Sequence, residues 1–169
     1  MGLFDKLFKK EEEVSLQPLD AADDAIVAIA DGELIDVSTV SDPVFAEQMM
    51  GKSTAFKYNK KTVLCSPANG TLSVLFPTGH AYGITTNEGV ELLVHCGVDT
   101  VNANGDGFKL LGKKQGDSVK AGEPIVEVDV EKLAKTYDMS TMLIITNDNG
   151  KSFDFIDPQK VSRGQSVIK

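Results

Sequence analysis

Turn residues interrupt this chain so often after Ala25 that no regular element can be long. Clusters of Gly, Pro, Asn and Asp occur at 31–32, 67–70, 77–79, 87–89 and 102–107. The stretches between these clusters are short and rich in apolar and β-branched residues, which is typical of strands. Many short strands at close spacing predict an antiparallel sandwich or distorted barrel. An α/β fold is excluded, because the alternating helices of about 10–15 residues that it requires are missing.

The expected elements are therefore mostly strands. We expect them at 25–29, 33–37, 54–58, 62–65, 70–76, 80–85, 90–96, 125–129, 142–146 and 153–156. The first two flank Asp31-Gly32 and have the pattern of a tight hairpin. Only the segments 44–50 and 130–137 indicate helices, and both are very short. The predicted fold class is all-β with very short helices.

The first 24 residues differ in character from the rest. Apolar side chains at positions 3, 4, 7 and 8 fall on one side of a short helix with lysines beside it, and a polar stretch containing Pro18 follows up to Asp24. We expect residues 1–24 to be a flexible amphipathic tail and linker, and residues 25–169 to be a single domain. Residues 2–10 are either a weak contact with anionic membranes or an inert end.

Charge and cysteine content restrict partners and compartment. The net charge of −8 argues against nucleic acid as a partner. The same charge suits a basic protein partner, although it also serves solubility alone. Cys65 and Cys96 fit a reducing compartment, with a single disulfide as the alternative. We expect a cytoplasmic protein, because the chain has neither a secretory signal pattern nor an apolar run of about 20 residues.

Two segments resemble the turn-and-strand units of the biotinyl/lipoyl-carrier type of β-sandwich. They are 66–72 and 115–125, and the second contains Gly116-Asp117-Ser118-Val119-Lys120-Ala121-Gly122. The resemblance implies a related sandwich with a duplicated hybrid motif. Those carriers present a modified lysine at a hairpin tip, and nothing here matches that tip. We therefore expect no swinging-arm cofactor.

The chain has only two histidines, and both fall in expected strands. Alternation along 90–96 places the apolar side chains of Val90, Leu92, Val94 and Cys96 on the core face. His95 therefore lies on the opposite face, together with Leu93 and Glu91. By the same alternation we expect His80 to share a face with Tyr82. A lone histidine can also be an ordinary surface or hydrogen-bonded residue, so its neighbours along the chain matter.

Those neighbours resemble a known family. Residues 91–101, with the sequence ELLVHCGVDTV, and Gly105-Asp106-Gly107-Phe108 after them are similar to the phosphorylation signature of glucose-family enzyme IIA proteins of the bacterial sugar phosphotransferase system. Residues 77–82, PTGHAY, resemble the second-histidine motif of that family, and residues 42–47 with 50–51 resemble its early segment. The resemblance runs in order from about Ala25 to Asn147, and the tail also resembles the start of free-standing members.

The resemblance implies a phosphocarrier. His95 would carry the phosphoryl group on Nε2, and His80 would support the phosphoryl oxygens. Thr78 would orient the second imidazole, while the close backbone approach at Gly97 would let a carbonyl hold the Nδ1 proton of His95. Imidazole suits this task because it is largely neutral at pH 7 and offers a lone pair without a separate base. No cofactor is required for this chemistry.

The resemblance also implies two partners and a docking face. The donor would be the histidine-containing phosphocarrier HPr, and the acceptor would be the IIB domain of a sugar permease. The implied apolar rim consists of Val44, Phe45, Phe76 and Leu93, and the acidic residues that would meet arginines of HPr are Asp42 and Asp99. Two alternatives stay open: residues 72, 74 and 76 could form one core face, and both aspartates could cap turns.

Two rival functions and a metal site complete the expectations. The spacing His95-x-x-x-Asp99 matches half of the zinc site of lysostaphin-type endopeptidases, but only His80 is left to complete that catalytic set. A regulatory binding module without transfer activity is the other rival. Zinc could also bind to His80 and His95 if a partner supplied a carboxylate.

Overall fold

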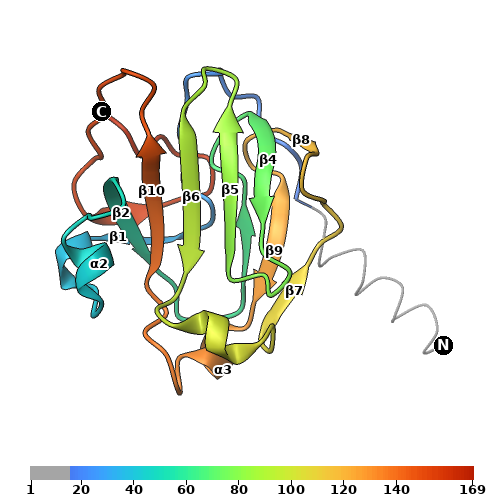
Figure 1. Cartoon of the computed structure of the whole chain (residues 1–169), viewed down its shortest axis with the longest axis vertical. Helices are drawn as coiled ribbons and strands as arrows, with labels where there is room; N and C mark the ends of the chain where they lie inside the picture. Colours follow the sequence, from blue (N-terminus) through green and yellow to red (C-terminus); the bar gives the residue numbers. More distant parts are fainter. Residues whose placement is uncertain (1–15) are drawn as a thin grey trace.

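Strands form nearly all of the regular structure in this computed structural model, which describes residues 16–169 (Figure 1). The helical pieces are η1 (Val37–Thr39), α2 (Pro43–Ala46), η2 (Thr100–Ala103) and α3 (Val130–Leu133). The strands are β1 (Gly32–Ile35), β2 (Lys52–Lys57), β3 (Thr62–Cys65), β4 (Gly70–Leu75), β5 (Ala81–Thr86), β6 (Glu91–Cys96), β7 (Phe108–Leu110), β8 (Ser118–Val119), β9 (Pro124–Val128), β10 (Thr141–Asn147) and β11 (Gln159–Val161). The predicted all-β class with very short helices is confirmed.

The strands make two antiparallel sheets that pack as a sandwich. The larger sheet has eight strands in the order β11-β1-β2-β10-β6-β5-β4-β8, and the smaller has the order β3-β9-β7. In Figure 1, β10, β6, β5 and β4 stand side by side, with β9 and β7 toward the right-hand side. The main apolar core joins residues of the large sheet, such as Leu92 and Leu143, to Leu64 and Val126 of the small one.

A second apolar cluster explains why α2 sits where it does. Consecutive side chains of β10 point to opposite faces, so Leu143 enters the main core while Met142 and Ile144 lie on the other face. Phe45 from α2 covers this other face and is 8% exposed. The start of α2 is fixed by Asp42, whose Oδ1 accepts a hydrogen bond of 2.8 Å from the Val44 amide.

Two of the expected strands are wrong. Residues 26–30 are buried on all sides, and their main-chain bonds go to several separate segments, including Pro67 and Gln165, and not to one neighbouring strand. This stretch makes only an isolated bridge between Val27 and Ser166, and β1 pairs with β2 and β11, so the predicted hairpin at Asp31-Gly32 is absent. Residues 153–156 likewise make only one bridge, at Phe155.

Other differences are smaller. The remaining strands begin and end within two residues of their expected bounds, and both helices stop after four residues. Strands β7, β8 and β11 were not expected from the sequence. They have two or three residues each, too few to show an alternating pattern.

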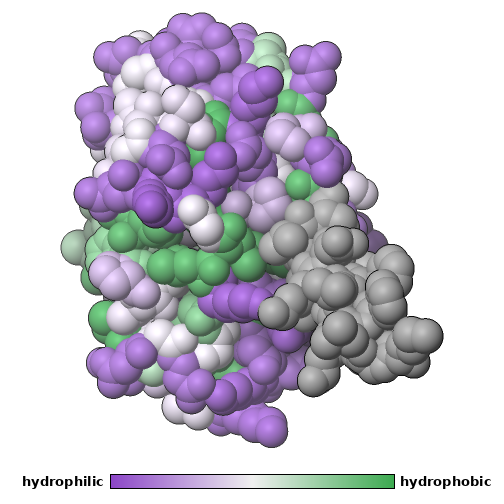
Figure 2. Space-filling model, turned by 90° about the vertical axis from the view of Figure 1, so that its right-hand side faces the viewer, coloured by the Kyte–Doolittle hydropathy of each residue, from purple (hydrophilic) through white to green (hydrophobic). Residues whose placement is uncertain are grey.

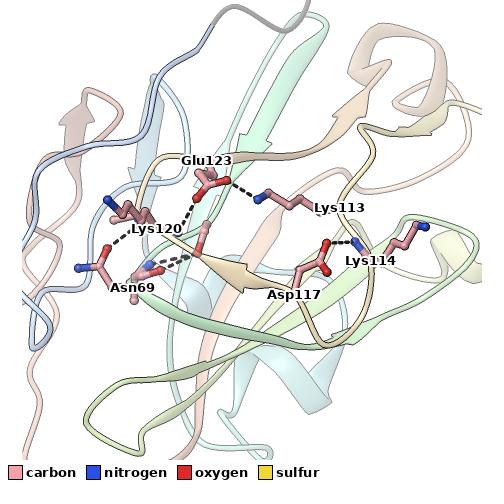
Figure 3. Close-up of polar contacts among 9 residues, drawn as sticks. Asn69, Lys113, Lys114, Asp117, Lys120 and Glu123 are labelled. Atoms are coloured by element: carbon pink, nitrogen blue, oxygen red, sulfur yellow. Dashed lines mark hydrogen bonds and ion pairs between the residues drawn. The ribbon is translucent and has the colours of Figure 1, made fainter.

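The carrier-like turn serves the structure of the sandwich (Figure 3). Asp117 accepts a hydrogen bond from the Lys114 amide, and Glu123 accepts one from the Lys120 amide while pairing with Lys113 at 2.6 Å. The Oδ1 atom of Asn69, in the other carrier-like segment, accepts a bond of 2.9 Å from the Ala121 amide. The two carrier-like segments are therefore bonded to each other in space.

The described part of the predicted linker lies on the sandwich. The Leu19 amide donates to the Ala121 carbonyl at 2.8 Å, and the Asn69 side chain donates to the Ala21 carbonyl at 2.8 Å. The proposed membrane segment, residues 2–10, lies outside the described residues. Within residues 16–169 no helix is long and apolar enough to cross a membrane. Cys65 and Cys96 are both buried free thiols, so the disulfide alternative is wrong.

Candidate functional site

The two histidines meet where neighbouring strands β5 and β6 are paired. His95 is the penultimate residue of β6 and lies opposite Ala81, the first residue of β5. His80 directly precedes β5, and its carbonyl accepts a hydrogen bond from the Cys96 amide. The two rings have centroids 5.3 Å apart and stand nearly perpendicular, at 80°. Strand pairing thus brings together two residues separated by 15 positions in the chain.

The ring of His95 is fixed by a main-chain oxygen two residues further on. Its Nδ1 atom lies 2.8 Å from the Gly97 carbonyl oxygen. A carbonyl can only accept, so Nδ1 must donate the hydrogen in this contact, and a neutral ring then keeps its lone pair on Nε2. Gly97 has φ +82, and a Cβ there would lie 2.5 Å from Cγ2 of Thr100. Only glycine allows this close approach without strain.

The ring of His80 is fixed by a hydroxyl two residues before it. Thr78 Oγ1 lies 2.5 Å from His80 Nδ1. A hydroxyl can donate to an unprotonated Nδ1, which places the hydrogen of a neutral imidazole on Nε2. The ring of Phe76 packs edge-on against His80 at 5.0 Å, and His80 is only 3% exposed. The site can therefore place the unprotonated Nε2 atom of His95 beside the Nε2–H group of His80.

The expected orientation of His80 is wrong. Tyr82 lies opposite Val94 in the main core, and its hydroxyl donates to the Cys65 carbonyl. His80 instead contacts His95, on the other face of the sheet. Strand alternation does not apply to His80, because β5 begins only after it.

Both imidazoles are held neutral at physiological pH by their surroundings. Burial lowers the pKa of His80, and the neighbouring His95 lowers it further. Burial also lowers the pKa of His95, although the hydrogen bond to Gly97 and the charges of Asp42 and Asp99 oppose this effect. A neutral His95 is the form that can act as a nucleophile.

The four residues of the expected apolar rim fall into two groups. Val44 and Phe76 are exposed, each to 41%. Phe45 is instead buried in the second apolar cluster, with its ring 4.9 Å from that of His95, and Leu93 is half-buried against the same cluster. Phe45 therefore packs against His95 and holds α2 on the sheet, and it does not form part of the exposed rim.

Phe76 is exposed because of an irregularity in β4. The pairing of β4 with β5 shifts between Leu72 and Val74, as in a β-bulge. Leu72 is fully buried, whereas Val74 and Phe76 point outward, so the alternative that these three share a core face is wrong. Figure 2 shows an apolar band on the side of the molecule that bears β7 and β9. Leu110 of β7 is one of the exposed apolar residues.

The two aspartates of the expected docking face differ in their local roles. Asp42 caps α2, which agrees with the turn-capping alternative, whereas the side chain of Asp99 makes no capping bond. Both carboxylates are close enough to His95 to raise its pKa. They therefore place negative charge beside the imidazoles, where a basic partner would meet it.

One contact near the site could not be anticipated from the sequence. The carboxylate of Asp138 accepts a hydrogen bond of 2.9 Å from the hydroxyl of Ser41, which lies next to Asp42. The two residues are 97 positions apart, so no local pattern indicates that they meet.

Within the described part of the chain, no group of three or more His, Cys, Asp or Glu side chains could hold a metal ion.

Comparisons with known proteins agree on one family. The model of the family described as phosphoenolpyruvate-dependent sugar phosphotransferase system, EIIA 1, matches residues 24–151. The PTS system glucose-specific EIIA component of Staphylococcus aureus (strain COL) is 36% identical over 169 residues, which cover 98% of this chain and 96% of that protein. The PTS system glucose-specific EIICBA component of Staphylococcus carnosus (strain TM300) is 37% identical over 138 residues, and the match spans 81% of this chain but 20% of that longer protein.

A solved structure is similar as well. Glucose permease IIA from Mycoplasma capricolum superposes with a TM-score of 0.80 and is 36% identical, over 85% of this chain and 93% of that one. The likeness therefore extends through the sandwich that carries the two histidines.

Proposed function

This chain belongs to the EIIA 1 family of the phosphoenolpyruvate-dependent sugar phosphotransferase system, and on that premise we propose that Nε2 of His95 is the atom that carries the phosphoryl group. The protein is a phosphocarrier in sugar uptake, which accepts a phosphoryl group from HPr and passes it to the IIB domain of a permease. The observation that supports His95 is its 2.8 Å contact with the Gly97 carbonyl, which leaves the lone pair on Nε2.

In the accepting step, Nε2 of His95 attacks the phosphorus atom held by HPr. The new nitrogen–phosphorus bond forms as the bond to the donor's nitrogen breaks, through a loose transition state with charge on the equatorial oxygens. A reaction of this kind depends on positioning and on electrostatic stabilisation. Phe45 and Gly97 supply the positioning, because they contact the ring of His95 from its neighbouring segments.

His80 supplies the electrostatic stabilisation in this proposal. With the Thr78 hydroxyl donating to Nδ1, the Nε2–H group of His80 can donate to a phosphoryl oxygen on His95. That bond matters most when the phosphoryl group leaves for the acceptor, since charge then grows on the oxygens. The exposed apolar side chains of Val44 and Phe76 would exclude water from the labile nitrogen–phosphorus bond while a partner is docked.

The rival functions lack such support. A lysostaphin-type endopeptidase needs further histidines, and both histidines of this chain are already paired with each other. A purely regulatory module would need no free nucleophile, yet the surroundings of His95 keep it neutral. The family match favours the phosphocarrier over both.

The test begins with uptake of phosphate. The protein is incubated with phosphoenolpyruvate, enzyme I and HPr, and its intact mass is measured under alkaline conditions, which preserve phosphohistidine. A gain of one phosphoryl group is expected for the wild type and none for His95→Gln. His80→Gln should still accept the group and should pass it to a purified IIB domain more slowly. Acceptance by His95→Gln but not by His80→Gln would show that the roles are reversed.

Three finer points are also proposals. The glucose-specific names of the relatives make the IIB domain of a glucose permease the first acceptor to assay. A cytoplasmic location suits a carrier supplied by HPr, and cell fractionation tests it. Zinc would take His80 and His95 as two of its four ligands, with a partner's carboxylate and a water molecule as the others. Calorimetry with zinc in the presence and absence of that partner tests this site.

A further inference from the structure

Asp138 lies in the loop between α3 and β10 and binds two segments at once. Its Oδ2 atom accepts hydrogen bonds from Ser41, at 3.2 Å from the amide and 2.9 Å from the hydroxyl. Its Oδ1 atom accepts two more from Ser140, at 3.0 Å and 2.7 Å. One carboxylate therefore fastens its own loop and joins that loop to the segment that leads into α2.

The main chain of the same loop holds the peptide group beside His95. The Asp138 carbonyl accepts a hydrogen bond of 2.8 Å from the Val98 amide, and the Ser140 carbonyl accepts one of 2.9 Å from the Gly97 amide. The Val98 amide and the Gly97 carbonyl belong to one planar trans peptide group, in which they point in opposite directions. Holding the Val98 N–H group therefore aims the Gly97 oxygen, and that oxygen lies 2.8 Å from Nδ1 of His95.

The other end of the bridge leads to a second contact with His95. Ser41 directly precedes Asp42, the residue that caps α2. From α2 the ring of Phe45 packs against the ring of His95, with centroids 4.9 Å apart. Asp138 is thus bonded both to the residue that leads into α2 and to the peptide group that follows Gly97.

We propose that Asp138 is a positioning residue for phosphoryl transfer, which holds the imidazole of His95 in one orientation and one tautomer. The inference rests on the role proposed above for His95. The carboxylate fastens Ser41, and the main-chain oxygen of the same residue fastens the peptide group after Gly97. Asp138 does not touch the reacting atoms itself.

The chemistry of the carboxylate suits this task. Burial alone would raise the pKa of Asp138, but the hydrogen bonds from Ser140 and Ser41 lower it below its usual value. The group is therefore charged at neutral pH. Hydrogen bonds to a charged acceptor are stronger than those between neutral groups. The Asp138 carboxylate can therefore hold its own loop and the segment of Ser41 together, although neither has regular structure.

The test compares Asp138→Ala with a matched control, Asp36→Ala. Asp36 accepts hydrogen bonds from the amide and the hydroxyl of Ser38, at 2.9 Å and 2.8 Å, just as Asp138 does from Ser140. The side chain of Asp36 does not, however, bridge to a distant segment. The kinetics of phosphorylation by phospho-HPr give kcat and KM for each variant. Nitrogen-15 spectra of the imidazoles show which ring nitrogen of His95 carries the hydrogen.

We expect Asp138→Ala to lower kcat by about three- to tenfold, because the orienting hydrogen bonds are weakened, with a smaller change in KM. Its His95 ring should show a mixture of tautomers, whereas the wild type and Asp36→Ala should show hydrogen on Nδ1 only. Ser41→Ala removes one donor and should shift kcat and the tautomers in the same direction by a smaller amount. This milder variant keeps the test valid if Asp138→Ala fails to fold.

The inference is overturned if both Asp138→Ala and Ser41→Ala match Asp36→Ala in kcat and keep the hydrogen on Nδ1 of His95. A failure of the proposed function looks different, since His95→Gln would then still accept a phosphoryl group or the wild type would accept none. The nitrogen spectra of unphosphorylated protein would still decide whether Asp138 orients the ring.

Discussion

Replacing Gly97 by alanine tests how much the main-chain oxygen beside His95 contributes. Gly97 has φ +82, a conformation that costs an alanine roughly 1–2 kcal/mol. The added Cβ would also lie 2.5 Å from Cγ2 of Thr100 and 3.0 Å from the sulfur of Met139, so the backbone must move by several tenths of an ångström. Overpacking of this kind costs typically about 1–3 kcal/mol. We therefore expect the free energy of unfolding to fall by about 2–5 kcal/mol.

The same movement should weaken the hydrogen bond between Nδ1 of His95 and the Gly97 carbonyl. A typical hydrogen bond contributes about 0.5–1.5 kcal/mol, so its loss should lower the rate of phosphoryl uptake by roughly two- to tenfold. Quenched-flow measurement with labelled phospho-HPr gives this rate, and urea unfolding gives the stability. Both are measured well below the unfolding transition of the variant, so that only folded protein reacts.

Gly112→Ala is the matched control. Gly112 also has a positive φ, +99, but no atom outside its neighbours lies within 4 Å of a Cβ placed there. It should therefore lose only the conformational share of stability, about 1–2 kcal/mol, and keep the normal rate. Equal losses of stability and rate in the two variants would refute the reasoning, because they would show that the contacts of Gly97 have no effect beyond its φ.

Three further predictions concern charge, pH and the apolar rim. His95 has a lowered pKa in the folded protein, so the unfolded chain binds more protons as the pH falls through 6.5, and acid destabilises the fold through this group. Urea titrations at about pH 8 and about pH 5 give the loss of free energy of unfolding on acidification. This loss should be smaller for His95→Gln than for the wild type, and equal losses would contradict the prediction. Asp99→Lys should slow phosphorylation by HPr and weaken its salt dependence with only a small fall in Tm, because Asp99 has φ 59 and lysine adopts this conformation less readily. Asp42→Lys should have the same kinetic effects and should also lose about 1 kcal/mol of stability with its helix cap. Phe76→Ala should slow phosphoryl transfer from HPr and lower the free energy of unfolding by only about 1 kcal/mol or less. The control Leu72→Ala, at a buried position, should lower the free energy of unfolding by about 2–5 kcal/mol and leave the transfer rate intact. The reverse pattern would show that Phe76 belongs to the core.

The sequence predicted best where the chain is regular. Strand β6 alternates without interruption, so the face that carries His95 was correctly separated from the core face of Leu92 and Val94. Alternation failed in β4, where a bulge between Leu72 and Val74 turns the following side chains outward. A bulge adds one residue without changing composition, so nothing in a single sequence indicates it.

Long-range contacts limited the prediction elsewhere. Residues 25–29 look like a strand because they are apolar, but burial on all sides produces the same composition. Their hydrogen-bond partners come from segments near residues 65, 67 and 165, which only the folded chain brings together. The bridge from Asp138 to Ser41 is of the same kind. The histidines themselves were found because the residues around each of them resemble a family signature.

The central place of β6 has a consequence for how the carrier meets its partners. β6 lies inside the eight-stranded sheet, with β10 on one side and β5 on the other. Its amides should be among the last to exchange with deuterium, because opening them requires two strand pairings to break. Because His95 belongs to such a stable strand, we expect its backbone position to be the same when donor and acceptor bind. Adaptation to two different partners is therefore left to the partners' own surfaces and to the exposed side chains of Val44 and Phe76.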